Sequence, residues 1–351
     1  MRKRVTLADV ASAAGVSPTT ASLVLSGRGD ELRISRAVQQ RVRESAEQLS
    51  YRPNILSLGL RNGRSSTLGF ISDTVATSQL AGDMIKGAID AANEHGFMLF
   101  IGESEGDPAA ESRLLNAMHD RQVDGVVLAS MFTQTREVPP ELAQFRAVLL
   151  NAIPAAPTHV PVVVPDEYTA GHAAARLLVD AGHRDIHLIG VGTDDEAVPP
   201  RTVAGHERLA GILDALKESD LRPVSGQLCD DWQPPEGRRA VRDLLDLYPR
   251  PGALLCFNDR LAFGAYQALE RAGLRVPDDV SVVSFDDYPL AAWLEPALTT
   301  LAIPHEQLGR YAVELLLGQI RERAEAPADP AVHRLDMPLR LRHSVAPAPG
   351  R

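Results

Sequence analysis

Cysteine is scarce in this 351-residue sequence, which contains only Cys229 and Cys256. Two cysteines are too few for a disulfide framework and have no metal-ligand spacing, so we expect buried thiols in a reducing compartment. Long apolar runs are also missing: Arg2, Lys3 and Arg4 lead directly into polar sequence, and no long run follows later. We therefore expect a cytoplasmic protein that is neither exported nor membrane-spanning.

The sequence motifs of several common enzyme chemistries are absent as well. Gly190-Val191-Gly192 lacks the third glycine of a dinucleotide-binding fingerprint, and there is no GxxxxGK[ST] phosphate loop. His305-Glu306 is not followed by a histidine at helical spacing, and no G-x-S-x-G nucleophile elbow is found. We expect a protein that is not an enzyme and that uses no cofactor and no metal ion.

Charge is unevenly divided along the chain. Residues 1–64 contain eleven Lys and Arg against five Asp and Glu, a net of +6, whereas the remaining 287 residues carry −16. Phosphate contacts require clustered basic residues, so the overall charge of −10 hides a basic segment that suits a nucleic acid. The length and the 44% hydrophobic content allow two or three compact units, which predicts a basic head on an acidic body.

The first short helix is predicted over residues 6–13. Thr6 and Asp9 have the spacing of a capping box, in which each residue satisfies a free backbone N–H at the start of a helix. Apolar residues then repeat at helical spacing, and Gly15 is expected to end the helix. The result is one apolar face on a helix of about two turns.

A second and a third helix are predicted to complete the head. Ser17 can cap the second helix, and Ser35 can cap the third. A tight glycine-containing turn between two short helices allows the second to lie in a DNA major groove. The residues expected toward the outside of this second helix or at its margin are Pro18, Thr19, Thr20, Ser22 and Leu23.

Periodicity alone leaves open an ordinary three-helix bundle. The basic residues favour DNA binding because they can reach phosphates. They are Arg2, Lys3, Arg4, Arg33, Arg36, Arg41 and Arg52.

This segment closely resembles the LacI/GalR family of bacterial repressors. The resemblance lies in VTLADVASAAGVSPTTASLVLSG at 5–27 and RESAEQLSYRPN at 43–54, which combine the two helices, the third helix and the start of a hinge in order. It implies that Pro18 and Thr19 read base edges, with the neighbouring residues on groove and backbone. The loop at 28–33 is longer than in the lactose repressor; it is either a solvated loop or places an arginine on a phosphate. The DNA-binding set is Thr6, Ser17, Pro18, Thr19, Thr20, Ser22, Leu23, Asn54 and Leu60.

Residues 54–64, NILSLGLRNGR, follow the head. Gly59 would cost a helix about 1 kcal/mol relative to alanine, and an isolated helix this short is marginal. The resemblance implies a hinge helix that folds on DNA, pairs with its twin in a dimer and wedges Leu60 into the minor groove. A flexible linker is the alternative, since Ser57, Leu58 and Gly59 depart from the usual family pattern.

From Thr67 onward, short apolar runs alternate with amphipathic segments. This alternation predicts an α/β fold with doubly wound parallel sheets that bind ligands at the carboxyl ends of their strands. The segment resembles the periplasmic sugar-binding-protein fold (type I) of the same family, which implies two subdomains around a ligand cleft. The strings that carry the resemblance are VDGVVLAS at 123–130, AGHRDIHLIG at 181–190, ERLAGILDAL at 207–216, CFNDRLAFGAYQAL at 256–269, VPDDVSVVSFDD at 276–287 and PALTTLAIP at 296–304.

The expected organisation has four parts, with an all-α head before the α/β core. The core is further expected to divide into two subdomains that the chain crosses between three times. The boundaries are 1–53 for the helix-turn-helix head, 54–65 for the hinge, 66–345 for the core and 346–351 for the tail, with subdomains at 66–163 plus 303–324 and at 164–300 plus 326–345.

The family resemblance also implies an effector site. Arg208 and Asp286 would hold effector hydroxyls, since a guanidinium fork and a carboxylate each suit a vicinal diol, and Trp232 would cover the apolar face of the ligand. Asn258, Asn151 and Asp73 fall at further cleft positions after predicted strands. A short polar residue after a strand can instead satisfy turn backbone, and Asp287 is assigned that role.

These expectations describe a homodimeric repressor that binds a pseudo-palindromic operator under control of a sugar or sugar derivative. The C-terminal sequence has no leucine heptads, so a dimer is expected rather than a tetramer. A solute-binding protein for transport and a sugar-processing enzyme are the two alternatives. The missing export signal and basic head argue against the first, and the absence of an activated nucleophile, metal set or phosphate loop argues against the second.

Overall fold

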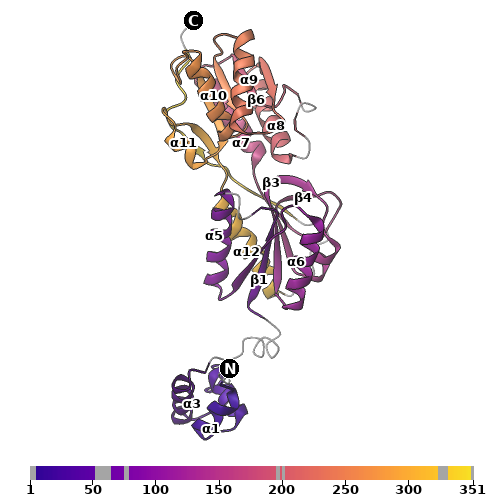
Figure 1. Ribbon diagram of the computed structural model, residues 1–351, viewed down its shortest axis with the longest axis vertical. Helices are drawn as coiled ribbons and strands as arrows, with labels where there is room; N and C mark the ends of the chain where they lie inside the picture. The colour runs from indigo at the N-terminus through magenta and orange to yellow at the C-terminus, as the bar shows by residue number, and fades with distance from the viewer. Residues whose placement is uncertain are drawn as a thin grey trace. The chain divides into compact units, whose positions relative to one another are not determined.

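The structure is a computed structural model that describes residues 5–51, 65–74, 79–194, 198–199, 202–322 and 331–348. Contacts within the chain divide it into two compact units, Met1–Ser65 and Ser66–Arg351 (Figure 1). Among the described residues, no helix is long and apolar enough to cross a membrane.

The first unit is a three-helix head, with α1 (Leu7–Ala14), α2 (Pro18–Leu25) and α3 (Arg36–Gln48). Thr6 and Asp9 form the expected capping box, and Gly15 ends α1 in the left-handed conformation at φ 67°. The Ser17 side chain accepts a hydrogen bond from the Thr20 backbone N–H at the start of α2. The core of the head consists of Val10, Ala11, Ala14, Ala21, Val24, Val42 and Ala46.

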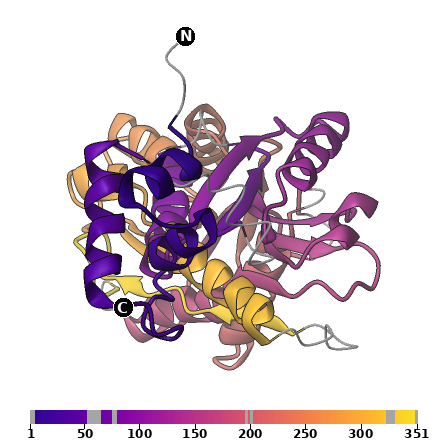
Figure 2. The same cartoon turned by 90° about the horizontal axis from the view of Figure 1, so that it is seen from below.

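The second unit begins with a six-stranded parallel sheet in the order β11-β5-β4-β3-β1-β2. One apolar cluster joins the sheet to α5 and α12, and a separate cluster joins it to α6, so the helices cover both faces (Figure 2). The elements are β1 (Thr67–Ser72), α5 (Gln79–Glu94), β2 (Met98–Glu103), α6 (Pro108–Asp120), β3 (Gly125–Arg136), the 3-10 helix η1 (Pro140–Gln144), β4 (Ala147–Pro154), β5 (Val162–Pro165), α12 (His305–Glu322) and β11 (Val332–Leu335).

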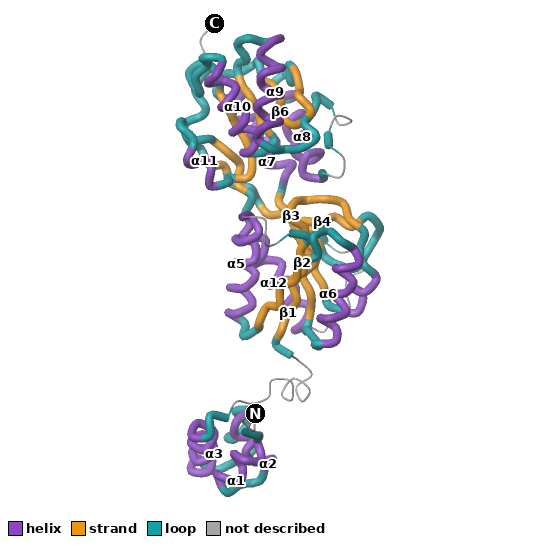
Figure 3. The backbone as a smooth tube through the Cα atoms, viewed as in Figure 1, coloured by secondary structure: helices purple, strands orange, loops and turns teal. Residues whose placement is uncertain are grey.

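A second six-stranded sheet has the order β12-β10-β9-β8-β6-β7, in which only β12 is antiparallel to its neighbour (Figure 3). The pair α7 and α8 and the pair α9 and α10 both pack on this sheet. The elements are α7 (Glu167–Asp180), β6 (Ile186–Gly190), α8 (Val203–Lys217), β7 (Ser225–Leu228), α9 (Pro234–Leu247), β8 (Ala253–Cys256), α10 (Asp259–Arg271), β9 (Ser281–Asp286), α11 (Pro289–Trp293), β10 (Thr299–Ala302) and β12 (Leu339–Arg340).

The chain crosses between the two sheets three times, after β5, after β10 and between β11 and β12. One expected boundary is wrong, because residues 326–345 do not all belong to the second subdomain. Val332–Leu335 instead pairs in parallel with β5 and extends the first sheet. The short segment alternates exposed and half-buried residues, and its position depends on the free edge that β5 offers rather than on its own pattern.

Paired glycines let the helices of each sheet approach closely. A Cβ on Gly171 of α7 would lie 2.2 Å from the Arg208 carbonyl oxygen, and a Cβ on Gly211 of α8 would lie 2.0 Å from that of Tyr168. Any larger residue would force the two backbones apart. The same arrangement recurs with Gly87 and Gly309 on α5 and α12, and with Gly237 and Gly264 on α9 and α10.

Both cysteines are free and buried, as the sequence predicts. Burial raises the pKa of the Cys229 thiol to about 11 and raises that of Cys256 further. The thiols are therefore protonated at neutral pH and serve as small apolar groups.

Candidate ligand cleft and nucleic-acid interface

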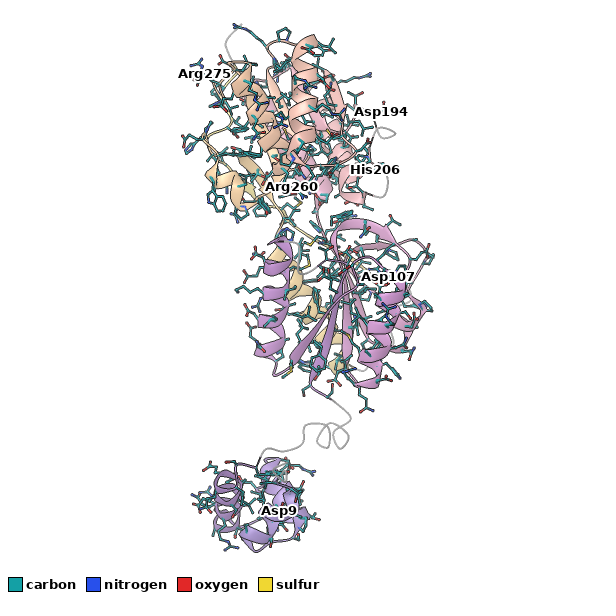
Figure 4. All side chains as sticks on the ribbon, in the orientation of Figure 1. Asp9, Asp107, Asp194, His206, Arg260 and Arg275 are labelled. Carbon is teal, nitrogen blue, oxygen red and sulfur yellow. The ribbon has the colours of Figure 1, made fainter. Side chains whose placement is uncertain are left out.

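A cleft of about 720 Å³ lies between the two sheets of the second unit, a size that suits a small-molecule ligand. The first subdomain contributes residues from β3, β4 and the start of α12. The second contributes residues at the carboxyl ends of its strands and in the first turns of its helices, including Arg260 (Figure 4). This location agrees with the rule that open α/β sheets bind ligands beyond the carboxyl ends of their strands.

Arg208 lies in this cleft, but its guanidinium fork is already occupied. Its Nε donates to Glu167 Oε2 at 2.5 Å and its Nη2 to Glu167 Oε1 at 3.1 Å. Nη1 donates to the Phe257 carbonyl oxygen at 2.6 Å, and Nη2 also reaches Asp286 Oδ1 at 3.5 Å. The guanidinium further lies 4.7 Å from the centre of the Phe285 ring. The fork expected to hold a diol is therefore committed to a buried protein carboxylate.

Asp286 stands at the end of β9 and lines the cleft. Burial raises the pKa of its carboxyl group, whereas Arg208 and Arg260 lower it. Burial and the neighbouring Asp286 together raise the pKa of Asp259, which accepts hydrogen bonds from the Tyr288 N–H and the Thr300 hydroxyl. The two carboxyl groups thus share one strongly desolvated region, in which Asp286 lines the cleft and Asp259 is fully buried.

Asp287 serves the turn rather than the cleft. Its φ of 57° lies in the left-handed region, where a short Asp is tolerated. Its carboxylate accepts from Arg342 Nη2 at 2.5 Å and lies 3.5 Å from Arg340 Nε. These contacts join the end of β9 to the C-terminal segment.

Trp232 and Asn258 line the cleft side by side. The indole N–H of Trp232 donates to the Gly190 carbonyl oxygen at 3.1 Å, and its ring meets Phe257 edge-to-face at 5.7 Å. Asn258 donates to the Trp232 carbonyl oxygen and accepts from the Leu261 N–H as the N-cap of α10. Its side chain therefore fixes the loop that carries Trp232.

The two candidates from the first subdomain behave differently. Asn151 lines the cleft at φ 54°, and its Oδ1 is buried without a hydrogen-bond partner among the described residues. Asp73 is not among the lining residues, although the adjacent Thr74 is. The Asp73 carboxylate accepts from the Met131 N–H at 2.9 Å and from Gln134 Nε2 at 3.1 Å, so it holds the end of β3 in place.

Several lining residues were not anticipated from the sequence. Glu167 pairs with Arg208 across 41 positions, and His305 begins α12 after the second crossing. Both lie within three residues of a strand's carboxyl end, and that position was the only available signal. The further unanticipated lining residues include Phe132, Thr133, Asp230, Asp231, Arg260 and Tyr288.

The second helix of the head presents most of the expected residues to solvent. Ser17, Pro18 and Thr19 are exposed, and Thr20 and Leu23 are half-buried. Ser22 departs from an exposed placement, since only 8% of it is exposed.

The other expected DNA contacts fall outside this exposed set. Thr6 is exposed but uses its hydroxyl in the capping box with Asp9. Asn54 and Leu60 lie outside the described residues.

Comparisons with known proteins agree with this two-part arrangement. Residues 6–54 match the family model described as bacterial regulatory proteins of the lacI family, and residues 175–345 match a periplasmic binding protein-like domain. The ribose operon repressor of Escherichia coli is 30% identical over 90% of this chain and 93% of its own length. The chain belongs to the LacI family. The PurR repressor of Aliivibrio salmonicida is 29% identical over 91% of this chain and 93% of its own length.

Solved LacI-family structures share the same architecture. A lac repressor dimer bound to operator superposes with a TM-score of 0.80 at 24% identity, covering 98% of this chain and all of the other. A complex of the regulator CelR with cellobiose has a TM-score of 0.65 at 28% identity and covers 97% of this chain and all of the other. This LacI-family protein is therefore a DNA-binding transcriptional repressor and not an enzyme, as the sequence predicts.

Proposed function

We propose that this LacI-family repressor binds a pseudo-palindromic operator as a cytoplasmic homodimer and changes its operator affinity when a sugar-like effector occupies the cleft. The observation that carries the proposal is the meeting of Trp232, Arg208 and Asp286 in one cleft between two sheets. In this proposal residues 1–53 form the head, 54–65 the hinge, 66–345 the core and 346–351 the tail.

The effector-binding part rests on complementary chemistry around the cleft. Trp232 offers an aromatic surface for the apolar face of a sugar ring, and Asp286 can accept hydrogen bonds from two neighbouring hydroxyls. Arg208 retains one Nη1 hydrogen without a partner among the described residues, which can donate to a ligand oxygen. Asn151 adds an open acceptor from the opposite subdomain, and Asn258 orients the Trp232 loop. We omit Asp73 from direct contact because its carboxylate is committed to β3.

The DNA-binding part rests on the exposed N-terminal turn of α2. Pro18 and Thr19 present their side chains where a recognition helix contacts base edges, and Ser17 and Thr20 lie beside them. Thr6, which is exposed at the start of α1, would contact the DNA backbone. Ser22 would have to act at the margin of the interface because it is largely covered. Asn54 and Leu60 complete the proposed set from the hinge.

Coupling between effector and operator follows from the three chain crossings beside the cleft. An effector that contacts both subdomains stabilises one relative orientation, and the change can pass to the hinge that follows the head. The coupling free energy is typically about 1–3 kcal/mol and reciprocal, so operator DNA must change effector affinity by the same factor.

The homodimer is supported by the edges of both sheets. β2 and β7 each occupy one sheet edge. β2 carries the exposed apolar side chains Met98, Phe100 and Ile101. Leu228 of β7 and Val224, the residue before β7, are exposed at the edge of the other sheet. An exposed apolar edge strand is an aggregation hazard unless another chain or element covers it. A second copy of this chain is the cover we propose, and the lac repressor bound to operator is likewise a dimer.

We expect Ile101→Lys to convert the dimer to a monomer, because Ile101 is 42% exposed on the edge strand β2. A charge brought into an apolar interface is left without a partner. Trp293→Lys is the control, since Trp293 is 77% exposed at the end of α11, a helix that packs on α10. Sedimentation equilibrium measures the outcome, and a dimer that persists in Ile101→Lys would rule out this edge as the interface.

Selection of duplexes from a random pool tests the proposed function. The purified protein should enrich a palindrome, and its affinity should fall steeply with salt because Lys and Arg contacts release counterions from DNA. Neutral sugars and sugar derivatives are then screened for a change in affinity for the selected duplex. Absence of enrichment at low salt would contradict operator binding, and enrichment without a response to any compound would contradict sugar control.

A further inference from the structure

The charged groups that line the cleft have a negative balance. Within the described residues they are the carboxylates of Glu167, Asp230, Asp231 and Asp286 and the guanidinium groups of Arg208 and Arg260. His305 adds no charge at neutral pH, because burial lowers its pKa to about 4. With the carboxylates ionised, the sum is −2, and protonation of one buried carboxyl group would still leave it negative.

The guanidinium fork of Arg208 is not free to take up a bidentate anion. Phosphate and carboxylate ligands are held best by two parallel N–H groups of one arginine. In Arg208 the Nε and Nη2 edge is filled by Glu167, a buried residue that a ligand would have to displace. Arg260 is half-buried and also lines the cleft, and its positive charge lowers the pKa of the Asp286 carboxyl group.

The opposite wall of the cleft presents neutral groups that still need hydrogen-bond partners. Thr133 Oγ1, Asn151 Oδ1 and both ring nitrogens of His305 have no hydrogen-bond partner among the residues that the structure describes. These residues are only 2%, 1% and 6% exposed, and all three line the cleft. A hydroxyl group can donate to the Asn151 oxygen and can both donate to and accept from Thr133 and His305. An anionic oxygen would face the Asn151 oxygen with no proton between them.

We infer that the effector of this repressor is a polyhydroxylated molecule that carries neither a phosphate nor a carboxylate group. The inference rests on the proposed effector function and adds the chemical class that the cleft accepts. Its basis is threefold: a negative lining, an arginine fork filled by Glu167, and a facing wall of neutral groups that hydroxyls satisfy. The lining carboxylates, with Asp230 and Asp231 among them, and the Glu167 carboxylate at the Arg208 fork decide this preference.

Matched pairs of compounds test the inference on the full-length protein. Each pair contains a neutral sugar and an anionic relative: glucose with glucose 6-phosphate, ribose with ribose 5-phosphate, and galactose with galacturonate. Calorimetry at pH 7.5 measures each dissociation constant at low and high salt. In every pair that binds, we expect the neutral member to bind at least about tenfold more tightly, with the ratio shrinking at high salt as the carboxylates are screened.

A variant at the rim shows whether the cleft charge causes the preference. In Asp230→Asn/Asp231→Asn both exposed rim carboxylates become neutral, and we expect the neutral-to-anionic ratio to narrow several-fold. The matched control Asp246→Asn removes an exposed charge on α9 outside the cleft and should keep the wild-type ratio.

Three results would count against the inference in different ways. An anionic member that binds as tightly as its parent would overturn the charge preference while leaving a sugar-responsive repressor intact. If the neutral-to-anionic affinity ratio were unchanged in the Asp230→Asn/Asp231→Asn variant, the cleft carboxylates would not be the cause of the preference. That result would contradict the inference. Failure of every compound to bind would contradict the proposed sugar control itself, and the inference would fail with it.

Discussion

Replacement of Arg208 by Met is expected to lower the free energy of unfolding of the core by about 3–5 kcal/mol, because it leaves the Glu167 carboxylate buried without its partner. The loss includes the hydrogen bond from Nη1 to the Phe257 carbonyl oxygen, which would also remain unsatisfied. Urea unfolding monitored by tryptophan fluorescence measures the change in midpoint and slope. The variant should also lose its response to any effector, since the cleft wall is no longer held in place.

The double variant Glu167→Met/Arg208→Met separates the contribution of the ion pair to stability from the contribution of side-chain packing. It removes both charges at similar volume, so we expect it to regain most of the stability lost in the single variant. Arg176→Met is the surface comparison, because Arg176 pairs with Asp180 at the exposed side of α7 and should cost only about 0–1 kcal/mol. A single Arg208 variant that is as stable as wild type would contradict the buried-pair interpretation.

Operator binding should depend on Leu60. We expect Leu60→Ala to weaken specific operator affinity by about tenfold or more, since unstacking a base step costs a few kcal/mol that an apolar wedge must offset. Binding to non-specific DNA should change little because phosphate contacts supply it. Fluorescence anisotropy with the selected palindrome and a scrambled duplex measures both affinities.

Leu58→Ala is the control for this variant, because Leu58 lies in the same hinge segment but is not the expected wedge. Equal operator affinities for wild type and Leu60→Ala would favour a flexible linker over an intercalating hinge. A similar loss in both variants would assign the effect to folding of the hinge as a whole.

Local signals in the sequence were sufficient for the head. The Thr6–Asp9 capping box, the Ser17 cap and the left-handed Gly15 are contacts between residues at most a few positions apart. Such contacts depend on side-chain chemistry and spacing alone, which is why the helix starts were predictable to within one residue. The burial of Ser22 was not predictable, because it depends on how α2 packs against the other helices.

The cleft was predictable only in outline. Arg208, Asp286, Trp232, Asn258 and Asn151 all line it, because strand ends gather at one edge of a parallel sheet. The hydrogen-bond partners of each side chain were not predictable. The Asp73 carboxylate accepts a hydrogen bond from the backbone of β3. Arg208 forms an ion pair with Glu167, and these two residues are 41 positions apart in the sequence.

The sequence by itself determined the order of helices and strands, the basic head, the family and the strand ends at which a ligand site forms. The family was inferred from resemblance of whole sequence strings, and the other features depend on periodicity, capping and composition, which are properties of neighbouring residues. Only the tertiary structure decided that β11 joins the first sheet, that Glu167 fills the fork of Arg208 and that His305 faces the cleft. Each of these depends on which distant segments come together, and paired glycines such as Gly171 and Gly211 set that approach through backbone contact that no local pattern encodes.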